Sequence, residues 1–358
     1  MLTFFHLRAA CLILMSTSLI GCANLGGKAV EGTHINYNQA IQNTTDQQLL
    51  LNLVRLRYRD TPLFIEISSI SAQLSYRASL AASADIRSGA DGTGLSGNVQ
   101  YSETPTVSYT PLQGDDFVKR LLSHIEPDKL VLLANSGWSI ERIFRVCVQR
   151  MNGLRNAPRA SGPTPATAPE YKDFNKFAKL IRQLQVNDAL QLTHVAVNKK
   201  PVAAFVFDDK RADGNSLESM KSMLGLSGSQ SKPLILNRNA ESGVSLTTRS
   251  LLGSLFYLSQ AVVVPAAHLK SGKVTVTKTA KGGVFDWSDM TRNLFMIKSS
   301  VTLPDNASVS VFYRGYWFYI EDNDLTSKST FSFLAQLFAL QAGATDSIKP
   351  VLTLPIGP

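Results

Sequence analysis

The chain has 358 residues, of which 44% are hydrophobic and 18% charged, with a formal net charge of +9. This balance excludes a disordered chain and a polytopic membrane protein. The length allows one large domain or two ordinary ones.

The N-terminal residues predict the compartment. Residues 1–8 carry one firm positive charge, and residues 9–18 are apolar but too few to span a membrane as a mature helix. Leu19-Ile20-Gly21-Cys22 follows directly and resembles the lipobox of bacterial lipoprotein signal peptides. An ordinary secretory signal with a chance cysteine is the weaker alternative, because the motif lies at the required distance behind the apolar stretch.

The lipobox resemblance implies several further properties. Residues 1–21 would be removed as a signal peptide, and Cys22 would carry diacylglycerol and an N-linked acyl chain such as palmitate. Ala23 after the cysteine implies sorting to the outer membrane. We therefore expect a lipid-anchored protein of the cell outer membrane that faces the periplasm.

Cysteine content and charge agree with this compartment. With Cys11 removed and Cys22 acylated, Cys147 would be the only free thiol of the mature chain, so no intramolecular disulfide is possible. Loss of Arg8 with the signal leaves a net charge of +8. A basic exported protein suits an anionic lipid surface, and nucleic acid is not expected as a partner.

The longest alternating pattern spans residues 70–111 and predicts one long amphipathic β-hairpin. Apolar residues occupy alternate positions on both sides of a turn-forming run at 88–94, and pairing Ile86 with Leu95 keeps apolar residues opposite one another. Each arm would reach on the order of 50 Å. The positions expected to form a membrane or partner face are Leu74, Tyr76, Leu80, Ile86, Leu95, Val99 and Tyr101.

The apolar face of the hairpin can be covered either by lipid or by protein. If it meets lipid, the hairpin is one part of an oligomeric outer-membrane barrel, whose strands need about ten alternating residues. If it meets protein, the hairpin lies on helices of its own chain or on a neighbouring subunit. Glu103 on the apolar face and Pro105 in the second arm count against lipid, and leave 78–86 and 95–101 as the crossing window.

The remaining pattern predicts an α+β fold, with N-terminal helices and the long hairpin followed by a C-terminal mixed α+β domain. Caps and apolar stripes predict helices at 115–124, 127–135, 139–152 and 326–341, a helix at 248–262 that is apolar almost all round and therefore central, and a turn at Arg314 and Gly315. A short tether is expected at 22–36, and the final residues are expected to dock as an edge strand. Four prolines at 156–170 predict a linker, because they cannot hold a helix or a strand ladder. This linker would separate a helical layer with the hairpin, at 37–155, from the α+β domain at 171–358.

Three arginines, Arg55, Arg57 and Arg59, crowd the end of a helix that is predicted to begin near Thr44 or Thr45. They either complement the helix dipole or contact phosphate, since guanidinium groups suit bidentate recognition.

No motif supports catalysis. Residues 92–97 match the GxGxxG pattern, but an alternating strand follows them and provides no helix N-terminus for a pyrophosphate. The histidines of the mature chain are isolated from one another, so no metal site and no cofactor beyond the acyl chains on Cys22 are expected. The acidic turn at 321–324 fits a helix N-terminus better than a calcium site. We therefore predict a non-enzymatic protein.

Two longer segments, residues 37–41 with 49–60 and residues 313–320 through 327–331, resemble a family of Gram-negative outer-membrane lipoproteins without a known activity. The resemblance covers most of the mature chain and implies no catalytic residue. The sequence thus predicts an envelope protein with two open roles. It either forms a homo-oligomeric pore or part of an export complex with its hairpins, or it is a periplasm-facing scaffold that binds envelope proteins.

Overall fold

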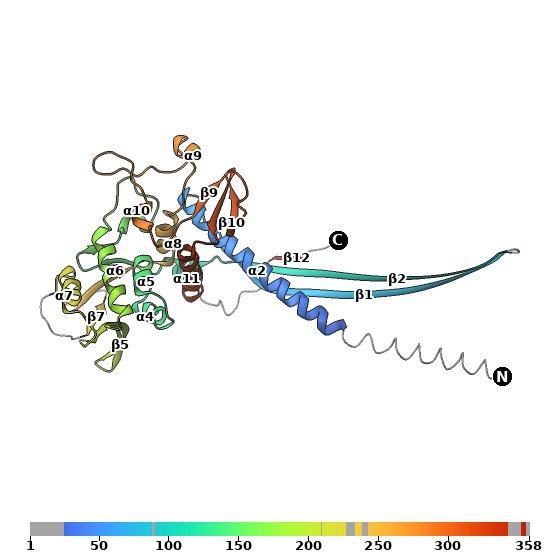
Figure 1. The fold of residues 1–358 in the computed structure, drawn as a ribbon, viewed down its shortest axis with the longest axis horizontal. Helices are drawn as coiled ribbons and strands as arrows, with labels where there is room; N and C mark the ends of the chain where they lie inside the picture. The colour runs from blue at the N-terminus through green and yellow to red at the C-terminus, as the bar shows by residue number, and fades with distance from the viewer. Residues whose placement is uncertain are drawn as a thin grey trace.

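The computed structural model describes residues 25–87, 90–208, 210–226, 233–237, 243–342 and 352–355. Helices and strands are mixed without a regular strand-helix-strand repeat, so the chain is an α+β protein, as the sequence predicted. Most elements form a head, and one long helix and one long hairpin extend from it (Figure 1).

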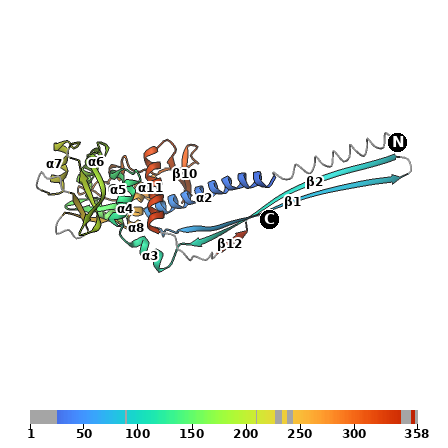
Figure 2. The same cartoon turned by 90° about the horizontal axis from the view of Figure 1, so that it is seen from below.

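Helix α2 (Leu25–Arg57) is followed by the hairpin strands β1 (Ile65–Arg87) and β2 (Ala90–Pro111). The C-terminal half of α2 lies in the head because Leu50, Leu53 and its other apolar residues form one buried stripe. The N-terminal half of α2 and the hairpin leave the head on the same side in both views (Figure 1, Figure 2).

Two predictions for this region are corrected. The segment expected as a tether is helical from Leu25 onward, and Thr44 lies inside α2, where its Oγ1 donates to the Ala40 carbonyl at 2.7 Å. This bond to the preceding turn replaces the expected capping role. The hairpin tip is also tighter, because pairing continues to Arg87 and Ala90 and leaves only residues 88–89 between the arms. The longer ladder satisfies backbone groups of the glycine-rich run that an open turn would leave unpaired.

The head contains further helices, of which the sequence did not predict the three short ones at 158–161, 266–270 and 288–291. They are α3 (Asp115–Leu122), α4 (Pro127–Asn135), α5 (Ile140–Cys147), η1 (Pro158–Ser161), α6 (Lys172–Val186), α7 (Gly214–Met223), α8 (Leu251–Ser259), α9 (Ala266–Lys270), α10 (Ser288–Thr291) and α11 (Leu325–Ala342). Helix α8 is buried on most sides, as expected for a central helix. Helix α5 is shorter than the predicted 139–152, because strand β3 begins at Val148 and pairs with β8.

A six-stranded sheet in the order β4-β3-β8-β7-β6-β5 crosses the head. Its strands are β3 (Val148–Met151), β4 (Leu154–Arg155), β5 (Leu190–Val197), β6 (Lys200–Phe207), β7 (Leu234–Asn237) and β8 (Val244–Thr248). Since β3 and β4 precede the proline-rich segment and the other strands follow it, one sheet joins the two predicted domains.

The proline-rich segment 156–170 is therefore packed into the head and is not a linker between domains. Ala157 and Ala160 are fully buried. The Ala168 amide donates to the Lys278 carbonyl, and the Lys278 amide donates back to the carbonyl of residue 166, both at 2.8 Å. Prolines prevent a regular ladder here, but they do not prevent burial. The buried apolar residues of both halves accordingly form one continuous core.

A second sheet, in the order β10-β11-β9, packs against α2. It contains β9 (Lys298–Ser300), β10 (Ala307–Tyr313) and β11 (Tyr316–Glu321), and the predicted turn at Arg314 and Gly315 has positive φ at both residues. Strand β12 (Leu352–Pro355) pairs with the base of β2 and confirms the expected edge strand.

Arg249 cross-links the centre of the head and is 1% exposed. Its guanidinium donates to the carbonyls of Arg145, Val146, Val148 and Asn156 and to Ser161 Oγ. Several of these carbonyls lie at the C-terminal end of α5, where the helix dipole favours a cation. Burial lowers the pKa of Arg249 to about 10, so the side chain stays charged at neutral pH.

We expect Arg249→Met to lower the free energy of unfolding by at least about 3 kcal/mol, because each buried carbonyl left without a donor costs about 1–3 kcal/mol. Denaturant unfolding of the purified protein measures this loss. Lys179→Met, at an exposed position of α6, is the matched control and should change stability by less than about 0.5 kcal/mol. A loss below about 1 kcal/mol in Arg249→Met would contradict the cross-linking role.

Candidate functional site

The hairpin is the most unusual element of the chain. Its distal arms extend away from the head and are paired only with each other among the described elements (Figure 2). With 23 and 22 residues, the strands are several times longer than an ordinary strand.

The register corrects the predicted pairing, and of the predicted face residues only Tyr76 and Tyr101 lie opposite each other. Ile86 pairs with Asp91 instead of Leu95, and Tyr76 pairs with Tyr101. The observed register differs from the expected one by four residues. Because an even shift does not exchange the faces of a strand, the apolar positions of both arms still share one face.

A β-bulge near the root extends that face toward the head. Ile67 pairs with Tyr109, whereas Ser69 pairs with Ser108, so β1 contains one extra residue between them. The extra residue changes the phase of the alternation. Ile65 and Ile67 therefore occupy the same face as Ile70, although their sequence numbers are odd.

Two acidic positions interrupt the apolar face of β2. Glu103 pairs with Leu74 and Asp91 pairs with Ile86, and both acids occupy positions on the same face as Tyr101. The face positions between the two acids are Thr93, Leu95, Gly97, Val99 and Tyr101, opposite Ala84, Ala82, Leu80, Ala78 and Tyr76. None of these intervening residues is charged.

Side-chain amides of α2 hold the root of the hairpin. Asn52 exchanges two hydrogen bonds with the backbone of Leu63, at 2.7 and 3.0 Å, and Gln48 does the same with Ile65, at 3.0 and 2.9 Å. Gln48 and Asn52 are four residues apart and therefore lie on one face of the helix. Leu63 and Ile65 are two residues apart and therefore present their backbone groups along one edge of the extended segment, so each amide meets one residue. We call these four residues the amide clamp. The sequence prediction missed it, although the one polar residue in the apolar run 49–54, Asn52, was the available signal.

The C-terminal end of α2 is docked by aromatic and charged side chains. Tyr58 Oη lies 2.7 Å from His268 Nδ1, and Asp60 accepts hydrogen bonds from Tyr313 at 2.5 Å and Arg314 at 2.9 Å. The Arg314 guanidinium also lies 5.3 Å from the centre of the Tyr58 ring. Burial raises the pKa of Tyr58 to about 12. These contacts hold the end of α2 against β10 and α9.

Of the three arginines considered for the helix dipole or for phosphate, Arg57 and Arg59 both reach Thr164, whereas Arg55 does not. Arg55 borders a shallow hollow that also includes Trp317, away from the other two. Arg57 Nη1 donates to Thr164 Oγ1 and Arg59 Nη2 donates to the Thr164 carbonyl, both at 3.0 Å. Arg59 is exposed, whereas Arg57 is only 5% exposed.

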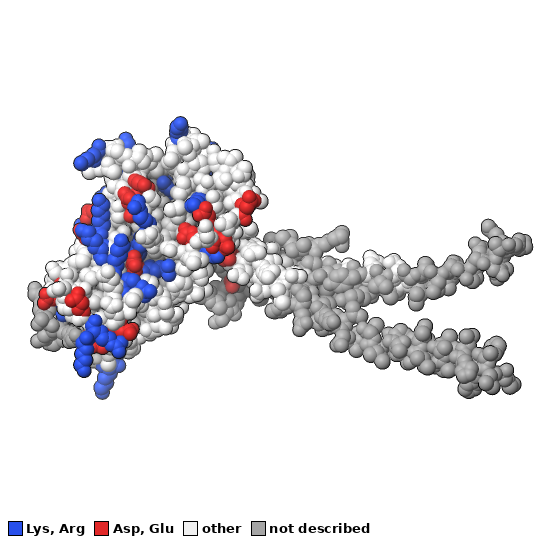
Figure 3. Space-filling model, viewed as in Figure 1, with Lys and Arg blue, Asp and Glu red and all other residues white. Residues whose placement is uncertain are grey.

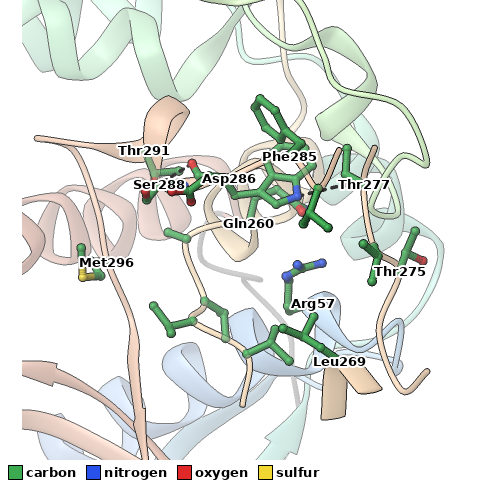
Figure 4. Close-up of a pocket in the computed structure, with 17 residues that line it drawn as sticks. Arg57, Gln260, Leu269, Thr275, Thr277, Phe285, Asp286, Ser288, Thr291 and Met296 are labelled. Atoms are coloured by element: carbon green, nitrogen blue, oxygen red, sulfur yellow. Dashed lines mark hydrogen bonds between the residues drawn. The ribbon is translucent and has the colours of Figure 1, made fainter. Parts of the chain in front are cut away.

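A cavity of about 310 Å³ opens beside Arg57 (Figure 4). Arg57 points into it from α2, with Gln260 and Thr277 near the guanidinium and Leu269 below. Burial lowers the pKa of Arg57 to about 10, so the cation persists at neutral pH. Arg57 follows Leu50 and Leu53 on the buried stripe of α2, which is the sequence signal for its burial.

The other motifs have structural roles. Asp324 Oδ1 accepts from the Ser327 amide at 3.0 Å, so the acidic turn caps α11, as predicted. The GxGxxG run at 92–97 lies within β2. Cys147 is buried, and burial raises the pKa of its thiol to about 12. Cys22 lies outside the described residues.

Lys and Arg side chains are mixed with acidic ones on the face of the head that Figure 3 shows. Lys176 pairs with Asp173 and Arg292 with Asp289, each at 3.2 Å. Exposed pairs of this kind add little stability. Each pair places a negative charge beside a positive one.

The described residues include no group of three or more His, Cys, Asp or Glu side chains that could hold a metal ion. None of the described helices is long and apolar enough to cross a membrane. No protein-family model, curated protein or solved structure matches the chain.

We expect removal of either side-chain amide to free the backbone N–H and C=O of one defined residue at the hairpin root. Asn52→Leu should accelerate hydrogen exchange of the Leu63 amide by about tenfold or more, because that N–H loses its acceptor. Gln48→Leu should do the same for the Ile65 amide. Each variant is the control for the other in residue-resolved exchange, and equal acceleration at both amides in both variants would contradict the one-to-one clamp.

We also expect His268 to make stability fall on acidification. Burial, followed by the charges of Lys273 and Arg314, lowers the pKa of His268 in the folded state. The unfolded chain then binds more protons, so the free energy of unfolding falls as the pH drops through about 6.5. Denaturant unfolding at pH 7.5 and pH 5.5 should show a smaller loss in His268→Gln than in the wild type. An equal loss in both proteins would exclude this histidine as the source.

Proposed function

We propose that this protein is a lipid-anchored outer-membrane protein with a non-enzymatic role, and that hairpins from several copies combine into a membrane-inserted pore or export channel. The observation that carries the proposal is the uncharged interval on the hairpin face between Glu103 and Asp91. Its length can be compared with the thickness of a membrane.

The interval has the height of a bilayer core. Glu103 lies twelve positions after Asp91, which corresponds to about 41 Å along an antiparallel strand. At the strand tilt of about 40° found in outer-membrane barrels, this length rises about 31 Å. The hydrocarbon core is about 30 Å thick, so both acids would lie at its boundaries, where a charge costs little. Glu103 thus marks one end of the membrane-crossing interval and does not interrupt it.

The edges of the hairpin support assembly between copies. Strand β1 is an edge of its sheet, and β12 covers β2 only at residues 106–109. Unpaired strand edges cannot remain in lipid, because their backbone groups have no hydrogen-bond partners there. Pairing of β1 in one copy with β2 in the next would remove both edges.

The direction of α2 agrees with the lipid anchor. Leu25 begins α2 at the end remote from the head, on the side to which the hairpin points (Figure 1, Figure 2). Cys22 precedes Leu25 by three residues. An acyl chain on Cys22 would therefore enter the membrane on the hairpin side.

The alternative of a periplasm-facing scaffold would require protein to cover the apolar face. In both views the described helices lie on the head or beside the proximal hairpin, and none covers the distal arms (Figure 1, Figure 2). This arrangement favours the inserted hairpin.

We expect the mature chain with Cys22→Ser, exported on a cleavable signal, to remain with outer membranes after an alkaline wash. Replacement of residues 75–102 by an Asn-Gly turn should release it, because Leu74 and Glu103 are already paired and the root is preserved. Complete release of the full-length Cys22→Ser chain would contradict insertion.

A matched pair of substitutions tests which face meets lipid. Leu80→Arg, in the middle of the apolar face, should reduce the membrane-retained fraction, because a charge at mid-bilayer costs about 2–4 kcal/mol. Ser79 is the adjacent residue and occupies the opposite face of the strand, so Ser79→Arg should remain with the membrane. The same behaviour of both variants would favour a soluble hairpin.

A further inference from the structure

Arg57 is a buried cation with unused hydrogen-bonding capacity. Its Nη1 donates to Thr164 Oγ1, but its Nε is buried and has no hydrogen-bond partner. No described carboxylate lies within 4.0 Å of the guanidinium to form an ion pair. An uncompensated buried charge is expensive, so a well-packed apolar residue would be the more stable choice for folding alone.

Arg249 shows how this head accommodates an arginine for stability. All three of its nitrogens donate to protein oxygens, and its guanidinium lies 4.0 Å from the centre of the Tyr257 ring. Arg57 has one such bond and instead points into the cavity (Figure 4). The difference indicates that the missing partner of Arg57 is a ligand.

The surroundings of Arg57 restrict the charge and position of that ligand. Thr164 Oγ1 donates to Gln260 Oε1 at 3.2 Å, and Thr277 Oγ1 donates to the Pro165 carbonyl at 2.6 Å, so neighbouring polar groups are already paired within the protein. Asp286 also lines the cavity, but it lies toward Ser288 and away from Arg57 (Figure 4). An anion would therefore bind at the Arg57 end.

The mouth of the cavity is apolar. Val263, Leu269, Val276, Val284 and Met296 line it and are each at least 36% exposed. Exposed aliphatic side chains around a buried cation form a site in which a charged head binds inside and a hydrocarbon chain lies at the opening. The volume of about 310 Å³ is at the lower end of small-molecule sites.

We infer that this cavity binds a small amphiphilic anion, an alkyl carboxylate or alkyl phosphate, with its head group against Arg57 and its tail between Val263 and Val284. The head group would accept a charge-assisted hydrogen bond from the accessible part of the Arg57 guanidinium. The tail would cover aliphatic side chains that otherwise contact water. This inference rests on the head and does not depend on insertion of the hairpin.

Calorimetric titration of the full mature Cys22→Ser chain tests the inference, in phosphatidylcholine nanodiscs if the chain is retained by membranes and in buffer if it is released, with the protein-free medium subtracted. Hexanoate and hexyl phosphate are the probes, and hexanol, acetate and inorganic phosphate each lack either the charge or the tail. At least one probe should bind tenfold or more tightly than all three reference compounds. The stronger probe identifies the head group as carboxylate or phosphate. Equal binding of hexanol would overturn the anion site, and equal binding of acetate or inorganic phosphate would overturn the role of the tail.

Arg57→Met separates a ligand role from a structural one. We expect it to weaken probe binding at least tenfold while the unliganded protein unfolds at the same or a higher denaturant concentration than the wild type. Unchanged binding, or destabilisation as large as that of Arg249→Met, would overturn the inference.

A second pair of variants leaves Arg57 in place. Val284→Glu puts an acid at the mouth of the cavity, and Val301→Glu puts one at a similarly exposed valine outside it, the two side chains being 74% and 72% exposed. We expect Val284→Glu to weaken probe binding at least tenfold and Val301→Glu to leave it unchanged. Equal binding by the two variants would overturn the placement of the tail.

Discussion

The amide clamp fixes the direction of the hairpin relative to α2. Asn52 and Gln48 each complete the hydrogen bonds of one backbone residue, as a neighbouring strand would, so the extended segment at Leu63 and Ile65 is held along the helix. The Tyr58 and Asp60 contacts then fasten the same helix to the head. Without these attachments a hairpin of this length could pivot about its root. The exit of α2 and the hairpin from the same side of the head, which the lipid-anchor argument uses, therefore originates in the head.

The sequence predicts the elements better than their connections. Alternation with a period of two identified the hairpin because one face is apolar, and caps and apolar stripes identified α3, α4 and α11. The tip was misplaced because Asp91-Gly92 is a strong turn pair, and only the full ladder shows that these residues belong to β2. The proline-rich segment suggested a domain boundary because composition cannot show burial. The cavity was not predicted, since Arg57 acquires its neighbours Gln260 and Thr277 through tertiary packing alone.

The two buried arginines illustrate why burial of a charge does not identify its role. Arg249 supplies donors to carbonyls at the end of α5, so the protein itself is its partner and the cation contributes to stability. Arg57 is almost as buried but has one hydrogen bond through its guanidinium and an open cavity beside it. Functional sites retain such unsatisfied groups at the expense of stability. The number of satisfied nitrogens, and not exposure, distinguishes the two.

The proposed assembly has a geometric limit that follows from the shape of one copy. Each copy supplies two strands, which occupy only about 12 Å of a barrel circumference at the usual strand spacing and tilt. A head of this size is about 50 Å wide. Heads placed side by side must therefore lie at a larger radius than the barrel, by about 6 Å for every copy in the ring.

The length of the proximal hairpin limits the number of copies. Between Ile65 and Leu74 it spans about 30 Å, which bridges this difference in radius for about four or five copies. Eight strands, hence four copies, are the smallest known outer-membrane barrels, so a planar ring would be near that minimum. A wider pore would require heads that interleave at more than one level.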